Sequence, residues 1–180
     1  MSAPGAIGPQ ITVYAQPNYK GALKTCYGPE YNLAFTGFDN RIASLEVTRG
    51  VWILYEEDHF GGNIYVVWEG QKINNLPMRS TSSLKPIEVH FPEDHSITLH
   101  NGPSFTGANK TFTSENPNLI GSGFQDSVIS VVVDSGAWVC YEHINYGGHQ
   151  YLFTRGAYNG SSSEGHFENN KMSSLKPIVF

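Results

Sequence analysis

Four short segments of the chain are rich in side-chain oxygen atoms, and one of them has the composition of a cation-binding loop. Residues 169–174 read Asn-Asn-Lys-Met-Ser-Ser, which is two amides, two variable residues and two hydroxyls. Calcium takes six to eight oxygen ligands, and a tight loop can offer amide oxygens, backbone carbonyls and a hydroxyl around one point. The same residue types also form Asx-type turns with no metal. The segment therefore supports two interpretations, a calcium site or a turn.

Three other six-residue segments share part of this pattern, and each of them also ends in serine. Two of them keep Asp or Asn at the second position, at Asn40 and Asp126, but have an apolar residue at the fifth. The third keeps the hydroxyl of Ser82 at the fifth position but has Arg79 at the second, a positive charge in place of a side-chain oxygen. These three segments are 39–44, 125–130 and 78–83.

Other chemistry is weakly represented in the sequence, so we expect no enzymatic activity. The histidines and cysteines show no His-Glu-x-x-His or Cys-x-x-Cys spacing, and no serine lies in a Gly-x-Ser-x-Gly turn. A net charge of -5 without a Lys/Arg cluster argues against nucleic acid as a partner. No apolar run approaches the length of about 18 residues that a membrane span needs, and no secretion signal is recognisable. We expect a cytoplasmic protein with reduced thiols at Cys26 and Cys140.

The elements that must position these loops are visible as repeats. Residues 50–65 recur at 136–151, and Ser82 to Ile87 recurs letter for letter at Ser173 to Ile178. A finer repeat pairs two aromatic residues five positions apart, followed by a glycine. Such a pattern suits a folded hairpin in which the glycine has a positive φ angle and the two rings pack together. The four hairpins are 14–21, 55–62, 100–107 and 141–148, the third with histidine as its first ring.

Short β-type runs between turn-forming residues, without sustained helical periodicity, predict an all-β fold. The Trp52–Glu56 and Trp138–Glu142 segments, together with the aromatic hairpins and residues 146–158, resemble the βγ-crystallin superfamily over nearly the whole chain. The resemblance implies two Greek-key β-sandwich domains with two motifs each, at 10–88 and 94–180. The two-domain layout and the calcium-type segments look most similar to a non-lens member, such as the epidermis-differentiation type.

The resemblance also implies how a calcium site would be assembled. In this family the two loops of a domain share ligands. One loop gives the side chain of its second residue and the backbone carbonyl of its third. The other loop gives the hydroxyl of its fifth residue, and a hairpin carbonyl completes the site. For this sequence the implied ligands are Asn40, Arg41, Ser82 and Glu56 in the first domain, and Asp126, Ser127, Ser173 and Glu142 in the second. A further site using Asn170 and the Lys171 carbonyl would face Ile129 instead of a hydroxyl. We expect one or two calcium ions per domain, bound with moderate affinity because each site has at most one carboxylate.

Two functions are compatible with these features. The first is a non-enzymatic, calcium-binding structural or stress-related protein whose fold is stabilised by the ion. The second is a protein- or glycan-recognition module of a membrane-active or inhibitory complex, with surface loops at 101–110 and 156–165 forming the contacts. A domain-paired monomer and a homodimer are both possible, since no residue fixes the connection between the domains.

Overall fold

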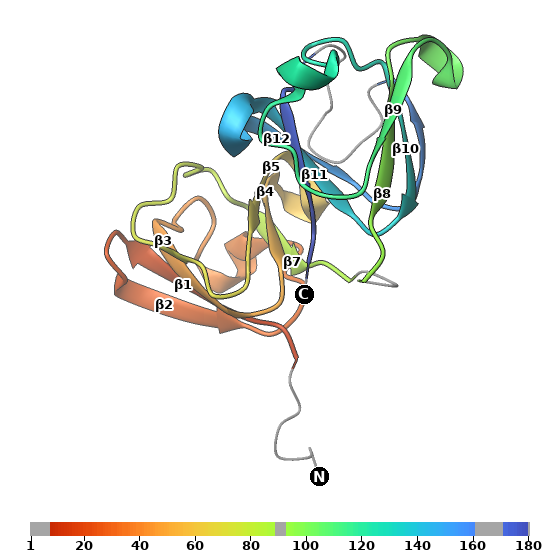
Figure 1. Cartoon of the computed structure of the whole chain (residues 1–180). Coiled ribbons are helices and arrows are strands. Elements are labelled where there is room, and N and C mark those ends of the chain that lie inside the picture. The colour runs from red at the N-terminus through yellow and green to blue at the C-terminus, as the bar shows by residue number, and fades with distance from the viewer. Residues whose placement is uncertain (1–7, 89–92, 161–170, 180) are drawn as a thin grey trace. The chain divides into compact units, whose positions relative to one another are not determined.

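The computed structural model describes residues 8–88, 93–160 and 171–179 (Figure 1). The chain divides into two compact units, the first ending at Glu88 and the second continuing to Val179. Among the described residues, regular structure consists of strands and five short 3₁₀ turns, which confirms the all-β prediction. No helix in this part of the chain is long and apolar enough to cross a membrane.

The first unit contains two antiparallel sheets around one hydrophobic core. One sheet has the strand order β2-β1-β3-β6, and in the other β4 lies between β5 and β7. Ile11 and Leu45 of the first sheet and Trp52 and Leu84 of the second are fully buried in this core. The strands are β1 (Gln10–Gln16), β2 (Lys20–Cys26), β3 (Ser44–Arg49), β4 (Trp52–Glu57), β5 (Gly61–Val67), β6 (Lys72–Ile73) and β7 (Ser83–Pro86).

The second unit repeats this design. One sheet has the order β13-β10-β8-β9, and in the other β11 lies between β12 and β14. Ile97 and Leu99 alternate toward the core from one sheet, and Trp138 and Leu175 are buried there from the other. The strands are β8 (Ser96–His100), β9 (Asn109–Phe112), β10 (Ser130–Ser135), β11 (Trp138–His143), β12 (Gly147–Phe153), β13 (Gly156–Asn159) and β14 (Ser174–Pro177).

Each unit is closed by chain segments exchanged between its two motifs. In the first unit, β6 pairs with β3 of the other motif, and Glu30 and Leu84 exchange backbone hydrogen bonds of 2.8 and 3.0 Å. In the second, β13 pairs with β10, and Asn116 and Leu175 exchange bonds of 2.9 and 3.0 Å. This exchange is the Greek-key connection that the sequence predicts.

The four aromatic hairpins fold as predicted. Their ring centroids are 5.8, 5.4, 5.9 and 5.4 Å apart in chain order. The glycine after each pair has a positive φ angle: 79° at Gly21, 76° at Gly62, 78° at Gly107 and 78° at Gly148. In each hairpin, the second aromatic residue and the residue before it also adopt positive φ angles, as at Phe60 (61°) and His59 (52°). The sequence did not predict this feature.

The sequence analysis was wrong about part of two loops. Residues 156–159 form β13 and pair with β10, and Asn109–Phe112 forms β9 and pairs with β8. Glycine and asparagine in these stretches suggested loops, but hydrogen bonding to a neighbouring strand outweighs their weak β propensity. The remainder of the predicted loop from 161 onward lies outside the described residues.

Candidate calcium-binding hollows

Two predicted ligands of the first unit meet in one surface hollow. Ser82 Oγ donates a hydrogen bond of 3.5 Å to Asn40 Oδ1, although these residues are 42 positions apart. The Asn40 amide donates to the Thr81 carbonyl at 2.9 Å, which holds the two loops together. Glu56 lines the same hollow. We refer to this site, lined by Asn40, Ser82, Glu56 and their neighbours, as the Asn40 hollow.

The second unit has the corresponding arrangement, which we refer to as the Asp126 hollow. Ser173 Oγ donates to Asp126 Oδ1 at 3.4 Å, and the Asp126 amide donates to the Met172 carbonyl at 3.0 Å. Glu142 and Lys171 line the hollow with them. Of the predicted ligands of this unit, the fold brings Asp126, Ser173 and Glu142 to one hollow. Asn170, which belongs to the predicted further site, lies outside the described residues.

The second position of each loop has a left-handed backbone. The φ angle is 54° at Asn40 and 49° at Asp126. Among residues other than glycine, Asn and Asp tolerate this region best, because their short polar side chains can hydrogen-bond locally. The residue type at this position is therefore favoured by backbone geometry as well as by any metal, which is the turn interpretation raised by the sequence.

The third-position residues, Arg41 and Ser127, were predicted to contribute a backbone carbonyl, but neither is among the residues that line its hollow, and their side chains have other contacts. Arg41 Nη1 donates to the Gly37 carbonyl at 2.9 Å, and Ser127 Oγ donates to the Gly123 carbonyl at 3.4 Å. Arg79, whose charge the sequence analysis placed in the other loop of the first unit, is exposed and donates to Asn75 Oδ1.

The oxygen atoms in each hollow suit a hard cation. A carboxylate or amide, a hydroxyl and backbone carbonyls are the ligand types that calcium takes in proteins, with waters completing the shell. In the second unit Asp126 supplies a charged oxygen where the first unit has the neutral amide of Asn40. The residues therefore fit calcium, with the stronger single ligand in the Asp126 hollow.

The charge around the two hollows differs in a way that the sequence analysis missed. The described lining residues of the Asn40 hollow include no lysine or arginine and four acidic residues: Asp39, Glu56, Glu57 and Asp58. In the Asp126 hollow the lining includes Lys171, and His143 Nε2 lies 3.1 Å from Glu142 Oε1. The acidic run Glu56-Glu57-Asp58 is visible in the sequence, but its position beside the loops is set by the hairpin.

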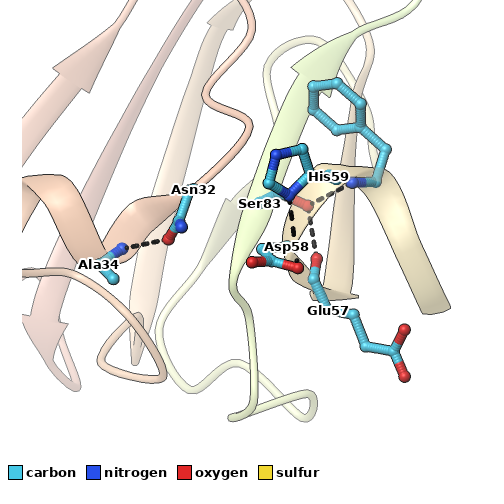
Figure 2. Close-up of polar contacts among 7 residues, drawn as sticks. Asn32, Ala34, Glu57, Asp58, His59 and Ser83 are labelled. Carbon is cyan, nitrogen blue, oxygen red and sulfur yellow. Dashed lines mark hydrogen bonds and ion pairs between the residues drawn. The ribbon is translucent and has the colours of Figure 1, made fainter.

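The last serine of each six-residue segment has a structural role. Ser83 Oγ accepts a hydrogen bond of 3.0 Å from the Phe60 amide and donates one of 2.6 Å to the Glu57 carbonyl, as Figure 2 shows. Ser174 makes the same two bonds to Tyr146 and His143, at 3.0 and 2.7 Å. Ser44 accepts a bond from the Tyr19 amide and donates one to the Gln16 carbonyl. Ser130 accepts from the Phe105 amide and donates to the Gly102 carbonyl. This serine fastens a folded hairpin in all four motifs.

Comparison with known proteins identifies the family. The Beta/Gamma crystallin family profile matches residues 10–87 and 96–178. Beta-crystallin B2 of Aquarana catesbeiana is 35% identical over 163 residues, covering 87% of this chain and 78% of that protein.

The chain is also similar to solved structures. A beta gamma crystallin from Ciona intestinalis is 29% identical with a TM-score of 0.43, covering 46% of this chain and 98% of that one. Protein S, solved in complex with calcium, is 21% identical with a TM-score of 0.39, covering 94% of this chain and 99% of that one. The assignment to a non-lens type stays a prediction. Since the profile matches both halves of the sequence, the chain belongs to the beta/gamma crystallin family.

Proposed function

We propose that this chain is a non-enzymatic structural protein whose fold is stabilised by calcium. The observation that carries the proposal is the approach of Ser173 Oγ to Asp126 Oδ1, 3.4 Å apart and from loops separated by 47 positions. Oxygen atoms from two distant segments converge there beside Glu142. A turn that only satisfied its own backbone would need no hydroxyl from the other motif.

Four residues of the second unit would hold the ion. Asp126 supplies a carboxylate oxygen, Ser173 a hydroxyl, and Ser127 and Glu142 backbone carbonyls. The ion would supply a positive charge that links the two motifs through these oxygens. With one carboxylate among the ligands, we expect a dissociation constant between about 10⁻⁶ and 10⁻³ M.

Calcium that binds the folded unit but not the unfolded chain raises the free energy of unfolding by mass action. At a free concentration about ten times the dissociation constant, the gain is about 1.4 kcal/mol. In the first unit, Asn40, Ser82 and the carbonyls of Arg41 and Glu56 would form the equivalent set, with a neutral amide in place of the Asp126 carboxylate. We expect the ligands of this site to carry less negative charge than those of the second unit, although the carboxylates around it add a field that favours a cation.

Calorimetric titration of calcium into chelator-stripped protein tests the proposal. We expect saturable heat and a higher melting temperature, with the second-unit contribution lost in Asp126→Ala and Ser173→Ala. The matched control is Asp134→Ala, which removes an exposed carboxylate of the same unit outside the hollow. The proposal is refuted by the absence of saturable binding at millimolar calcium, or by equal binding in the wild type and Asp126→Ala.

A further inference from the structure

Three partly exposed rings gather beside the Asn40 hollow, and we refer to Tyr31, Phe35 and His59 as the aromatic patch. Tyr31 is 52% and Phe35 77% exposed, and the His59 side chain is 67% exposed. The Tyr31 ring centroid lies 6.1 Å from that of Phe35 and 5.2 Å from that of His59. These rings therefore form one contiguous aromatic surface rather than scattered exposed residues.

The fold does not require this patch, because the second unit builds the same backbone without it. His59 donates its amide to the Tyr31 carbonyl at 2.7 Å, and Asn145 donates to the Pro117 carbonyl at the same distance. The φ and ψ angles are 52° and 33° at His59, and 57° and 35° at Asn145. Phe35 lies in a 3₁₀ turn, Leu33–Thr36, whose counterpart has glycine at the corresponding place.

The two 3₁₀ turns are also capped alike. Asn32 accepts a hydrogen bond of 3.0 Å from the Ala34 amide, and Asn118 accepts one of 2.9 Å from the Ile120 amide. Proline, glycine and asparagine thus replace all three rings while the backbone angles, the cap and the hydrogen bond between the two turns are kept. A set of exposed rings that stability does not demand is better explained by recognition of a partner.

The chemistry next to the patch defines what it would recognise. Asn32 and Ala34 line the Asn40 hollow and flank Tyr31 and Phe35 in the chain, so the rings adjoin the acidic surface. His59 Nδ1 lies 3.5 Å from Asp58 Oδ1, and Figure 2 shows this pair next to the Glu57 backbone. Asp58 and Glu57 are both exposed.

Arginine matches both parts of this surface. Its planar guanidinium group stacks on aromatic faces and forms paired hydrogen bonds to carboxylates. We propose that the aromatic patch and the adjoining carboxylates bind an arginine-containing basic segment of a partner protein. The site needs no metal, and the proposal does not rest on calcium binding.

The test is a titration of ¹⁵N-labelled protein, in chelator, with a nonapeptide that carries three arginines separated by glycine and leucine. We expect shifts concentrated on the amides of residues 31–35 and 57–59. Replacing the arginines with citrulline, which keeps the shape and removes the charge, should abolish them. Because the measurement excludes calcium, its result is independent of the calcium proposal.

Two double variants separate the contributions of rings and charges. The double variant Tyr31→Ala with Phe35→Ala should weaken binding by about fivefold or more. This follows because each exposed cation–π contact contributes about two- to fivefold in affinity. Glu57→Gln with Asp58→Asn should weaken it similarly and reduce its dependence on salt. Leu23→Ala, at another exposed apolar residue of the first unit, is the control and should bind as the wild type does.

Three results would overturn the proposal. The first is equal binding of the arginine and citrulline peptides, and the second is unchanged binding in both double variants while the variants remain folded. The third is a stronger response of the same amides to a neutral oligosaccharide such as maltoheptaose, which would assign the patch to a glycan. Melting temperatures confirm folding, and the isosteric Glu57→Gln and Asp58→Asn changes keep the test valid if the ring variant fails to fold.

Discussion

Replacing Ser83 with alanine tests whether the last serine of the calcium-type segment fastens the hairpin. Ser83 is fully buried, and its hydroxyl bonds to the Phe60 amide and the Glu57 carbonyl. Its neighbour Ser82 is only partly buried, and the Ser82 hydroxyl makes one long hydrogen bond of 3.5 Å to Asn40. The two adjacent serines therefore form a matched pair with different expected roles.

The magnitude follows from the number of bonds lost. A typical intramolecular hydrogen bond contributes about 0.5–1.5 kcal/mol net, so the two bonds of Ser83 amount to about 1–3 kcal/mol. Alanine fills the same space apart from the hydroxyl oxygen, so the cavity cost is small. For Ser82→Ala, the distance is at the limit of a hydrogen bond, and we expect less than about 0.5 kcal/mol in the absence of calcium.

Urea unfolding in chelator, followed by near-ultraviolet circular dichroism, measures both variants. Hydrogen exchange at the Phe60 amide gives a local readout, since this amide loses its acceptor only in Ser83→Ala. We expect a lower unfolding midpoint and faster Phe60 exchange in Ser83→Ala alone. The reasoning is refuted if Ser83→Ala costs less than about 0.5 kcal/mol, if Ser82→Ala costs as much, or if Phe60 exchange is unchanged.

Two further predictions concern a hairpin glycine and the thiols. Gly148→Ala should lower the free energy of unfolding by about 1–3 kcal/mol, because φ is 78° and a Cβ would lie 2.6 Å from the His143 ring. Gly28→Ala is the control: this glycine lies in open space without a positive φ, so the urea midpoint should be nearly unchanged. Burial raises the pKa of the Cys26 thiol to about 11 and also raises that of Cys140. The stability contributed by these neutral thiols is complete below the unfolded thiol pKa of about 8.5 and is lost as pH rises through the folded values. Urea midpoints should therefore fall between pH 8 and pH 10, and less steeply in Cys140→Ala; an equal fall in that variant would contradict the assignment.

The repeats made the architecture predictable from sequence. An aromatic pair followed by glycine can be recognised because both rings and the positive φ are needed for one local hairpin. The pairing of Asn40 with Ser82 and of Asp126 with Ser173 was predicted from the resemblance to the family, and the structure brings each pair together. Whether these pairs bind calcium is still a prediction.

Features that depend on contacts between distant segments could not be predicted in the same way. The last serine was visible in all four segments, but its hydrogen bonds depend on the completed fold, since those of Ser83 reach a hairpin 23 to 26 positions away. The aromatic patch likewise joins Tyr31 to His59 across two separate turns. No short-range pattern in the sequence reports such contacts. The strand at 156–159 was missed because glycine and asparagine there resemble a loop.

The origin of each hollow in two different motifs has a consequence for the lifetime of the folded state. Asp126 and Ser173 belong to different motifs, which Asn116 and Leu175 also join by backbone hydrogen bonds, so the two side chains meet only where both motifs are folded together. We therefore expect that a cation that needs both loops would form its contacts late in folding. Contacts absent from the transition state slow unfolding and leave the folding rate nearly unchanged. Such an ion would lower the unfolding rate of the unit. A single motif separated from its partner would lack this effect.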